Sequence, residues 1–206
     1  MAADPVASAV PADATRFLLV RHGETDYNAE GRWQGCRSDP PLNARGHAQA
    51  EAIADVLTGR RVEALYTSPQ RRARETAALL SRRLVLEPLV IEDLREMDHG
   101  EWEGKTKAEI LARWAREFEA FEADPLHVRR PGGDSYEDLA ARVWPTLERL
   151  ADHHRGETIA LVTHGGPVRL ILSRVLDRPL TERGEFGVDN ASVFTVEESS
   201  GQWLGG

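Results

Sequence analysis

Short apolar runs alternate along this chain with longer stretches in which apolar residues recur at helical spacing. Phe17–Val20 is a continuous apolar run typical of a central parallel strand, and Thr158–Val162 gives the clearest strand pattern. Val62–Tyr66 and Leu89–Ile91 are shorter strand candidates, and Ser192–Val196 is expected to be a last strand at the sheet edge. This alternation predicts an α/β fold, a three-layer α/β/α sandwich around a mostly parallel sheet.

Residues that can cap a first turn mark the predicted helix starts. Asn43 precedes a helix with a one-sided apolar stripe, formed by Ala50, Ile53, Ala54 and Leu57. Ser68 followed by Pro69 predicts a helix from Pro69 to about Leu80, with Ser68 as its N-cap. Pro167 is expected to begin the helix that follows the clearest strand.

Two further helices are predicted in the second half of the chain. Thr106–Glu109 has the spacing of a capping box, and the helix it begins should reach about Glu122. Ser135–Asp138 caps the next helix, which should reach about His153. Pro145 lies within that range and is expected either to kink the helix or to mark a boundary just before it.

Three segments with reactive side chains each follow a predicted strand. They are Arg21-His22-Gly23, Ser68–Arg74 and His164-Gly165-Gly166. In open α/β sheets, ligands bind beyond the carboxyl ends of the strands. We therefore expect these segments to converge on one site although they are far apart in the sequence.

His22 is the first candidate for covalent chemistry. A lone histidine is more often structural, but Gly23 lets a ligand approach the backbone closely and Arg21 offers a guanidinium fork for an oxyanion. A neutral imidazole can attack phosphorus when its other nitrogen donates to a fixed acceptor. His164 precedes a helix start, where free N–H groups suit a phosphate, although a purely structural role in the turn stays open.

Two roles have several candidates close together in the sequence: the arginine that faces the site and the carboxyl group that acts as general acid. The helix after Ser68 carries Arg71, Arg72 and Arg74, and helical spacing allows only one or two of them to face inward without choosing which. A general acid for the leaving alkoxide must be a carboxyl group held protonated by burial or nearby negative charge. By composition alone the candidates are four acidic residues: Glu96, Asp98, Glu101 and Glu103.

Composition and charge narrow the class of protein. The 206 residues are 41% hydrophobic and 29% charged, as in a globular domain with a core of its own. A formal net charge of −8 argues against a nucleic-acid partner, while the charge of a pocket can still be positive locally. Cys36 is the single cysteine, which fits a cytoplasmic protein without an internal disulfide. We find no motif for a metal site.

The first residues have a composition of their own. Met1–Thr15 is rich in Ala and Pro, and it lacks the basic start and the long apolar run of a secretory signal. We expect a flexible leader there, followed by one domain over residues 16–206. No apolar run approaches the roughly 20 residues needed to span a bilayer, so no membrane partner is expected.

Four motifs in order resemble those of a known family. They are Arg21-His22-Gly23-Glu24-Thr25, Ser68-Pro69 with Arg72-Ala73 and Thr76-Ala77, Glu96 before Gly100-Glu101-Trp102-Glu103-Gly104, and Val162-Thr163-His164-Gly165-Gly166. From about Phe17 to Val196 the chain resembles the histidine phosphatase superfamily, in the branch of cofactor-dependent phosphoglycerate mutases and broad-specificity phosphatases. The resemblance implies the phosphoglycerate mutase-like form of the α/β/α sandwich.

The resemblance also implies residue roles. His22 would be the phosphate acceptor, and Arg21, Arg72 and His164 would complete the phosphate pocket. Glu96 would protonate the leaving alcohol and then activate water, with no metal and no cofactor. The remaining substrate-binding positions that it implies are Asn28, Gln34, Gly35, His99 and Gly165.

Within the family the pattern favours hydrolysis of small phosphate esters. Mutases carry a longer insertion before the second histidine and Arg-His-Tyr after the acid, where this chain has Met97-Asp98-His99. A phosphoglycerate mutase and a non-catalytic phosphate- or protein-binding module stay as alternatives. The expected partner is a small phosphorylated metabolite, and a homodimer stays open.

A helical cap over the site is expected within about residues 104–134. Its aromatic residues either pack internally or line the pocket for the leaving group. These residues are Trp114, Phe118 and Phe121.

Overall fold

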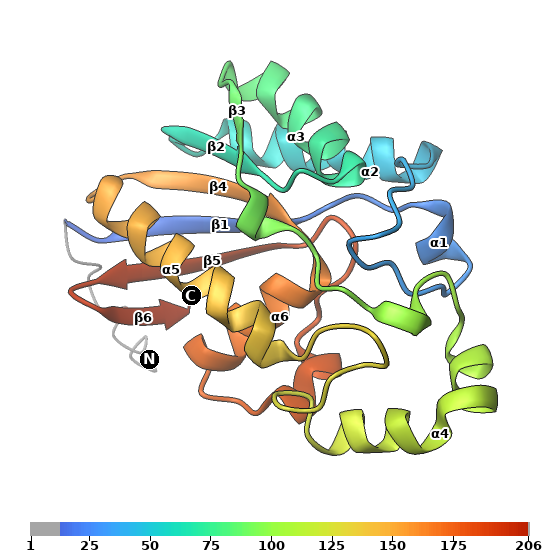
Figure 1. The fold of residues 1–206 in the computed structure, drawn as a ribbon. Coiled ribbons are helices and arrows are strands. Elements are labelled where there is room, and N and C mark those ends of the chain that lie inside the picture. The colour runs from blue at the N-terminus through green and yellow to red at the C-terminus, as the bar shows by residue number, and fades with distance from the viewer. Residues whose placement is uncertain (1–12, 206) are drawn as a thin grey trace, which may run out of the picture.

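A six-stranded sheet forms the middle of the protein (Figure 1). The computed structural model describes residues 13–205. The strands, in the order β3-β2-β4-β1-β5-β6 across the sheet, are β3 (Pro88–Val90), β2 (Ala64–Thr67), β4 (Thr158–Thr163), β1 (Thr15–Arg21), β5 (Val193–Ser199) and β6 (Gln202–Gly205). The first four are mutually parallel, and β5 and β6 each pair antiparallel with the preceding neighbour. The predicted mostly parallel sheet is confirmed.

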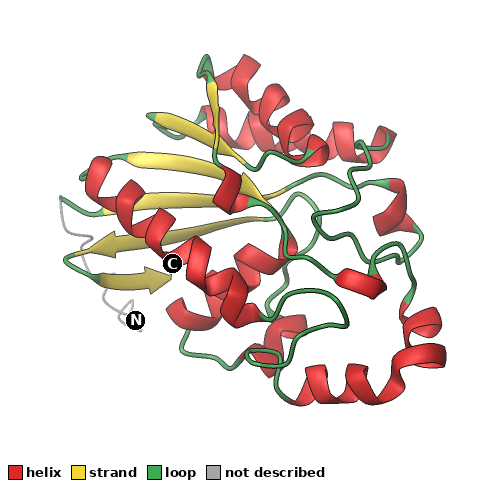
Figure 2. Ribbon diagram, in the orientation of Figure 1, coloured by secondary structure: helices red, strands yellow, loops and turns green. Residues whose placement is uncertain are grey.

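Helices cover both faces of this sheet (Figure 2). Alternate residues of the central strands point to opposite faces, so that Leu18 and Val20 pack with α2 (Ala44–Thr58) and α3 (Arg71–Leu84). Phe17 and Leu19 belong to the other cluster, with α5 (Tyr136–His153) and α6 (Gly165–Val175). The three-layer sandwich predicted from the sequence is therefore confirmed. None of the helices in residues 13–205 is long and apolar enough to cross a membrane.

The remaining helices lie in the connections. They are α1 (Asp26–Ala29), α4 (Lys107–Ala123) and three 3₁₀ turns, η1 (Glu92–Leu94), η2 (Gly100–Trp102) and η3 (Leu180–Glu185). Figure 1 shows α4 outside the three layers, on the side to which β1 points.

Two predictions at the ends of the chain are wrong. The strand at Val193–Ser199 is not at the edge, because a two-residue turn leads into β6, whose Trp203 contacts the Phe17 ring at 5.2 Å between centroids. Thr15 is not part of a leader, since it begins β1 and its buried hydroxyl donates to two carbonyls of the chain near the end of α5. The rest of the predicted leader, residues 1–12, lies outside the described residues.

The helix starts follow the sequence except where a cap residue has another partner. The side chain of Asn43 accepts from Gly46 N, the predicted capping box at Thr106 is formed, and the predicted cap at Ser135 is a capping box as well. The predicted start of α3 at Pro69 is wrong, since Gln70 is the N-cap of the helix, and the hydroxyl of Ser68 is hydrogen-bonded to His164. Arg71 begins the helix, and its N–H donates to Asp39 Oδ1 at 2.6 Å.

One further helix start differs from the sequence pattern, while the predicted end of α5 at about His153 is confirmed. The helix after β4 begins at Gly165 instead of Pro167, with His164 as N-cap. The chain stays helical through Pro145, so no helix boundary lies before that residue.

Strand register brings the two central histidines together. Arg21 is paired with Thr163 across the parallel β1 and β4 strands, and His22 N donates to Thr163 O at 3.0 Å. His22 and His164 therefore leave the sheet side by side at its carboxyl edge.

Candidate active site

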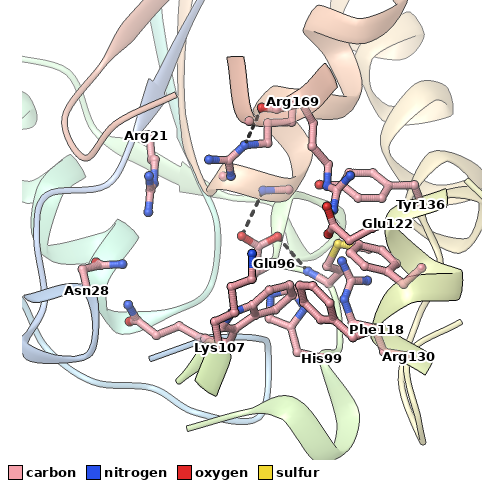
Figure 3. Close-up of a pocket in the computed structure, with 18 of the residues that line it drawn as sticks. Arg21, Asn28, Glu96, His99, Lys107, Phe118, Glu122, Arg130, Tyr136 and Arg169 are labelled. Atoms are coloured by element: carbon pink, nitrogen blue, oxygen red, sulfur yellow. Dashed lines mark hydrogen bonds and ion pairs between the residues drawn. The ribbon is translucent and has the colours of Figure 1, made fainter. Parts of the chain in front are cut away.

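A cavity of about 530 Å³ opens beyond the carboxyl ends of β1 and β4 (Figure 3). Its walls come from the segment after β1, the loop before η2, the start of α6, the inner face of α4 and η3. The convergence of strand-end segments that the sequence predicts is therefore present. His22 lines this cavity together with Arg21 and Glu96.

The orientation of the His22 imidazole is fixed by two hydrogen bonds. Nδ1 donates to the carbonyl of Gly23 at 2.7 Å, and Nε2 accepts from Arg72 Nε at 3.2 Å. This pattern assigns the neutral tautomer with its lone pair on Nε2. Burial, together with the charges of Arg72 and Arg21, lowers the pKa of His22 well below its ordinary value. The ring is therefore neutral, and its unprotonated Nε2 can act as a nucleophile.

Two guanidinium groups flank this imidazole without an acidic partner. Nη1 of Arg21 donates to Val188 O at 2.7 Å, and the Arg72 fork donates to backbone carbonyls of residues 35 and 38. Neither arginine forms an ion pair within residues 13–205, and burial lowers the pKa of Arg21 to about 10, so that it stays charged at neutral pH. Their uncompensated charges favour an oxyanion next to His22.

Among the three neighbouring arginines of α3, only Arg72 is buried. Arg71 is exposed and pairs with Glu75, and Arg74 is exposed. The structure thus places at the site the arginine that the family resemblance implies.

His164 lies behind His22 and has no exposed surface. The two rings are 5.2 Å apart between centroids, and His164 Nε2 is 2.7 Å from Ser68 Oγ. Burial first, then the charge of Arg72, lowers the pKa of His164 well below its ordinary value. Its Nδ1 has no hydrogen-bond partner in the described part of the chain, which leaves it free for a bound anion.

Glu96 is the one of the four acidic candidates that faces His22 across the cavity. Its carboxylate accepts from Gly166 N at 3.0 Å and from Met97 N at 3.0 Å. Asp98 pairs with Arg37, while the other two candidates, Glu101 and Glu103, do not line the cavity.

Two residues that sequence reasoning missed hold Glu96 in place. Gln70 bridges two loops, since its amide donates to Gly35 O and accepts from Glu96 N, both at 2.8 Å. Arg142 of α5 donates to the carbonyls of Asp93, residue 95 and Glu96. Neither had a signal in the sequence, because the partners of both are backbone groups of distant loops.

The other predicted substrate positions divide between the cavity wall and the layer behind it. Asn28, Gln34, His99 and Gly165 line the cavity. Gly35 does not, and its carbonyl instead accepts from Arg72 Nη2 at 3.2 Å.

Arg169 and Arg130 line the cavity although the sequence reading did not select them. Arg169 lies four residues after Gly165, so the helical period could have placed it on the same face. Arg130 precedes Pro131 in a loop, where no periodicity indicates its direction.

The aromatic residues of α4 have both of the roles left open by the sequence. Phe118 and Phe121 line the cavity, and both also contact the Trp102 ring in the core. Trp114 is buried at a break in the helix and does not reach the cavity.

Within residues 13–205, the one group of side chains spaced to hold a metal ion is Cys36, Asp98 and Glu103. None of them lines the cavity. Glu103 already accepts from the backbone N–H groups of residues 37 and 38.

Comparison with known proteins finds one family and several phosphatases that are similar to this chain. The family model for the histidine phosphatase superfamily (branch 1) matches residues 17–204. "Phosphoserine phosphatase 1" of Hydrogenobacter thermophilus is 33% identical over 181 residues, covering 88% of this chain and 85% of the relative. "Metal-independent phosphoserine phosphatase" of Arabidopsis thaliana is 36% identical over 200 residues, covering 95% of this chain and 81% of the relative. A mycobacterial glucosyl-3-phosphoglycerate phosphatase, solved with VO3, has a TM-score of 0.83 at 34% identity, covering 93% of this chain and 96% of its own.

Proposed function

The chain belongs to branch 1 of the histidine phosphatase superfamily, and we propose that this phosphomonoesterase cleaves small phosphate esters through a phosphohistidine on His22. The observation that carries the proposal is the tautomer of His22, whose Nε2 lone pair accepts from Arg72 Nε, while neither Arg72 nor Arg21 has an ion-pair partner within residues 13–205. A phosphoryl group held there is in reach of the nucleophile, and positive charge compensates its oxygens.

In the first step His22 Nε2 attacks phosphorus and the bond to the leaving oxygen breaks. The substrate's phosphoryl oxygens replace the imidazole as the partner of the Arg72 Nε–H group. Glu96, in its protonated form, gives its proton to the leaving alkoxide, which departs as an alcohol. The Nδ1 bond to Gly23 O stabilises the positive charge that the ring acquires.

In the second step water attacks the phosphohistidine. Glu96, now ionised, takes a proton from this water, so that inorganic phosphate leaves and neutral His22 is regenerated. Arg21, Arg72 and His164 hold the phosphoryl oxygens in both steps.

The residue after the acid supports hydrolysis over phosphate return to a reoriented product. Met97 is buried and lines the cavity with an apolar side chain, which offers no polar group to hold a phosphorylated product. Water is therefore the proposed acceptor.

The proposed architecture is a single domain that begins with β1 at Thr15, with a cap formed within about residues 104–134. Phe118 and Phe121 of α4 support it, because they close one side of the cavity. The proposed location is the cytoplasm, which the single cysteine, Cys36, supports.

The first experiment measures phosphate release in the presence of EDTA. The substrates are 4-nitrophenyl phosphate, O-phosphoserine and 3-phosphoglycerate, and full turnover is expected with the chelator present. His22→Ala should lower kcat by about 10⁴-fold or more, because the nucleophile is lost. Acid-labile label should be trapped on His22 when ³²P-labelled substrate is quenched in base.

His47→Ala is the matched control, since His47 is an exposed histidine on α2. It should keep wild-type turnover and labelling. Label on another residue, or normal turnover by His22→Ala, would contradict the assignment of the nucleophile.

A further inference from the structure

The turn at residues 189–192, which leads into β5, lies against the segment of the nucleophile. The antiparallel pairing of β1 with β5 continues into this turn, since Arg21 N donates to Ser192 O at 3.0 Å. The next bond runs from Ala191 N to His22 O at 3.1 Å. The register of the two strands therefore places Asn190, a polar residue that no motif marks in the sequence, beside the end of β1.

The amide nitrogen of Asn190 contacts three oxygen atoms of the segment after β1. Nδ2 lies 3.2 Å from His22 O, 3.3 Å from Gly23 O and 3.0 Å from Asn28 Oδ1. An amide nitrogen carries two hydrogens, so that one is donated to Asn28 and the other is shared by the two carbonyls. One side chain thus holds two successive peptide groups and a residue of the cavity wall.

The Gly23 carbonyl is the group that fixes the His22 ring. It accepts from His22 Nδ1 at 2.7 Å, which leaves the lone pair of the ring on Nε2. A carbonyl oxygen has two lone pairs, so it accepts from the imidazole and from Asn190 at the same time. The bond from Asn190 therefore restrains the direction of this carbonyl and, through it, the tautomer of the nucleophile.

Asn190 also restrains the direction of the Asn28 amide. Asn28 Oδ1 accepts from Asn190 Nδ2, and it accepts from N and Oγ1 of Thr25 at 3.2 and 3.1 Å. All three partners are donors, which assigns the oxygen end of the amide to them. The nitrogen end faces the cavity (Figure 3), where it can donate to a phosphoryl oxygen.

We propose that Asn190 is a positioning residue of the reaction. It holds the Gly23 carbonyl against His22 Nδ1, and it turns the nitrogen of the Asn28 amide toward the phosphoryl group. This inference rests on the proposed function. Asn190 does not line the cavity, so it acts through these neighbours and not on the substrate. A reacting group misplaced by about 1 Å can lose roughly 100-fold in rate, so one side chain behind the site is enough to control turnover.

Two substitutions of Asn190 test this role with 4-nitrophenyl phosphate as substrate. Asn190→Asp keeps the shape of the side chain but replaces the donor by an oxygen that faces three other oxygens. Asn190→Ala removes the donor without this repulsion. We expect kcat to fall by about 100-fold or more in Asn190→Asp and by about 10-fold in Asn190→Ala. KM should change by less than about 3-fold, because the arginines that bind the phosphoryl group stay in place.

The tautomer of His22 is a readout that a loss of packing alone would not move. Imidazole nitrogens with and without a proton give separate signals in a two-bond ¹H–¹⁵N correlation spectrum, and the spectrum of His22→Ala identifies those of His22. The wild type should show a protonated Nδ1 and an unprotonated Nε2. In Asn190→Asp the two signals should move toward each other, because both tautomers are then populated.

A double-mutant cycle measures the part that acts through Asn28. Asn190→Ala should lower kcat less in the Asn28→Ala background than in the wild type, because the amide that it orients is already absent. Equal losses in both backgrounds would contradict the role of Asn190 in orienting Asn28.

Ser192→Ala is the matched control, because Ser192 lies in the same turn and its hydroxyl donates to Asp189 O at 2.7 Å. It should keep the wild-type kcat and the wild-type tautomer. Wild-type kcat in Asn190→Asp, or a slower Asn190→Asp with an unchanged His22 tautomer, would overturn the inference. If Asn190→Asp fails to fold by circular dichroism, the same two measurements on Asn190→Ala decide.

The spectrum separates this inference from the proposed function, since it needs no turnover. If the wild type hydrolyses no ester and the His22 tautomer still changes in Asn190→Asp, the phosphatase is refuted and the hold of Asn190 on His22 stands. Full turnover and full labelling of His22 in Asn190→Asp would refute the role of Asn190 alone.

Discussion

The bond from Arg72 to His22 Nε2 shows how one residue can prepare another for reaction. It occupies the lone pair that attacks phosphorus, while the Gly23 carbonyl fixes the other nitrogen. Two bonds thus select a single ring orientation and a single tautomer. Because an anion competes for the same guanidinium, substrate binding itself uncovers the lone pair in the proposed reaction.

Substitution of Glu96 by Gln should separate the two chemical steps. The variant lacks the proton for the leaving alkoxide, so kcat for alkyl esters should fall by about 10²- to 10⁴-fold. With 4-nitrophenyl phosphate, whose leaving group needs no proton, the first step should stay fast while hydrolysis of the phosphohistidine slows. Stopped-flow absorbance should then show a burst of one nitrophenolate per site.

Glu101→Gln is the control for that experiment, because Glu101 is an exposed acid in η2, the turn that follows the loop of Glu96. It should show neither the loss nor the burst. Wild-type rates for alkyl esters in Glu96→Gln would rule out Glu96 as the general acid.

Which residues of the site could be predicted from the sequence depends on what each residue contacts. The family resemblance implied Arg72 and Glu96 among their neighbours, and the structure places both at the cavity or directly behind it. Gln70 and Arg142 could not be predicted, since their partners are backbone groups brought close only by the fold. Arg130 was missed for a similar reason, because a loop residue has no period that shows where it points.

At the scale of elements, the approach of α2 to the end of β1 positions the segment after His22. Gly23 and Gly46 lie so close that a Cβ on Gly23 would overlap the carbonyl oxygen of Gly46. Asn43, which caps the same helix, donates from its amide to the side chain of Glu24 at 3.1 Å. The start of α2 therefore supports the wall of the phosphate site.

Gly23→Ala should disturb both the helix and the site. The added methyl group meets main-chain atoms that cannot rotate away, so the free energy of unfolding should fall by about 1–3 kcal/mol. The turnover should fall as well, because the Gly23 carbonyl orients His22. Urea unfolding and steady-state kinetics on the same preparation measure both effects.

Gly59→Ala is the matched control at the other end of α2. Its nearest atom would be 3.9 Å away and its φ is −79°, so an alanine fits without strain. Equal stability of the two variants would contradict the close-packing explanation.

The start of a helix could be predicted where the hydrogen bonds of its cap residue lie within the same first turn. Asn43, Thr106 and Ser135 cap helices as expected, because their partners lie within the same first turn. Ser68 has an equally good local pattern, but its hydroxyl pairs with His164, 96 residues away, and α3 begins later. The strand β6 was missed because it has only four residues, of which Trp203 alone packs against the core.

At the scale of the whole molecule, charge is unevenly distributed. The chain has a net charge of −8, yet the half-buried Arg21 and the buried Arg72 and Arg130 carry positive charge around one cavity. Three imidazoles buried among these arginines, His22, His99 and His164, have pKa values lowered well below 6.5. This environment links the stability of the whole fold to pH.

The free energy of unfolding should fall as the pH drops below about 6.5. In the unfolded chain these three histidines become protonated near that pH, whereas in the folded chain they stay neutral to much lower pH. The unfolded state therefore binds more protons, and each histidine adds up to about 1.4 kcal/mol per pH unit of lost stability. Urea unfolding at pH 7.5, 6.5 and 5.5, in buffers free of phosphate, measures the slope.

His99→Gln should flatten that slope by the share of one histidine. His47→Gln, which changes an exposed histidine, should leave it as in the wild type. A slope in His99→Gln equal to that of the wild type would contradict the link between burial and acid sensitivity.

The pairing of Arg21 with Thr163 across β1 and β4 also makes turnover a reporter of folding. A shift of β1 by one residue along β4 would turn His22 to the opposite face of the sheet, away from Arg72 and His164. A collapsed chain with slipped strands could show native secondary structure by circular dichroism and still be inactive. During refolding from urea, the recovery of activity would therefore time the moment at which the two central strands align.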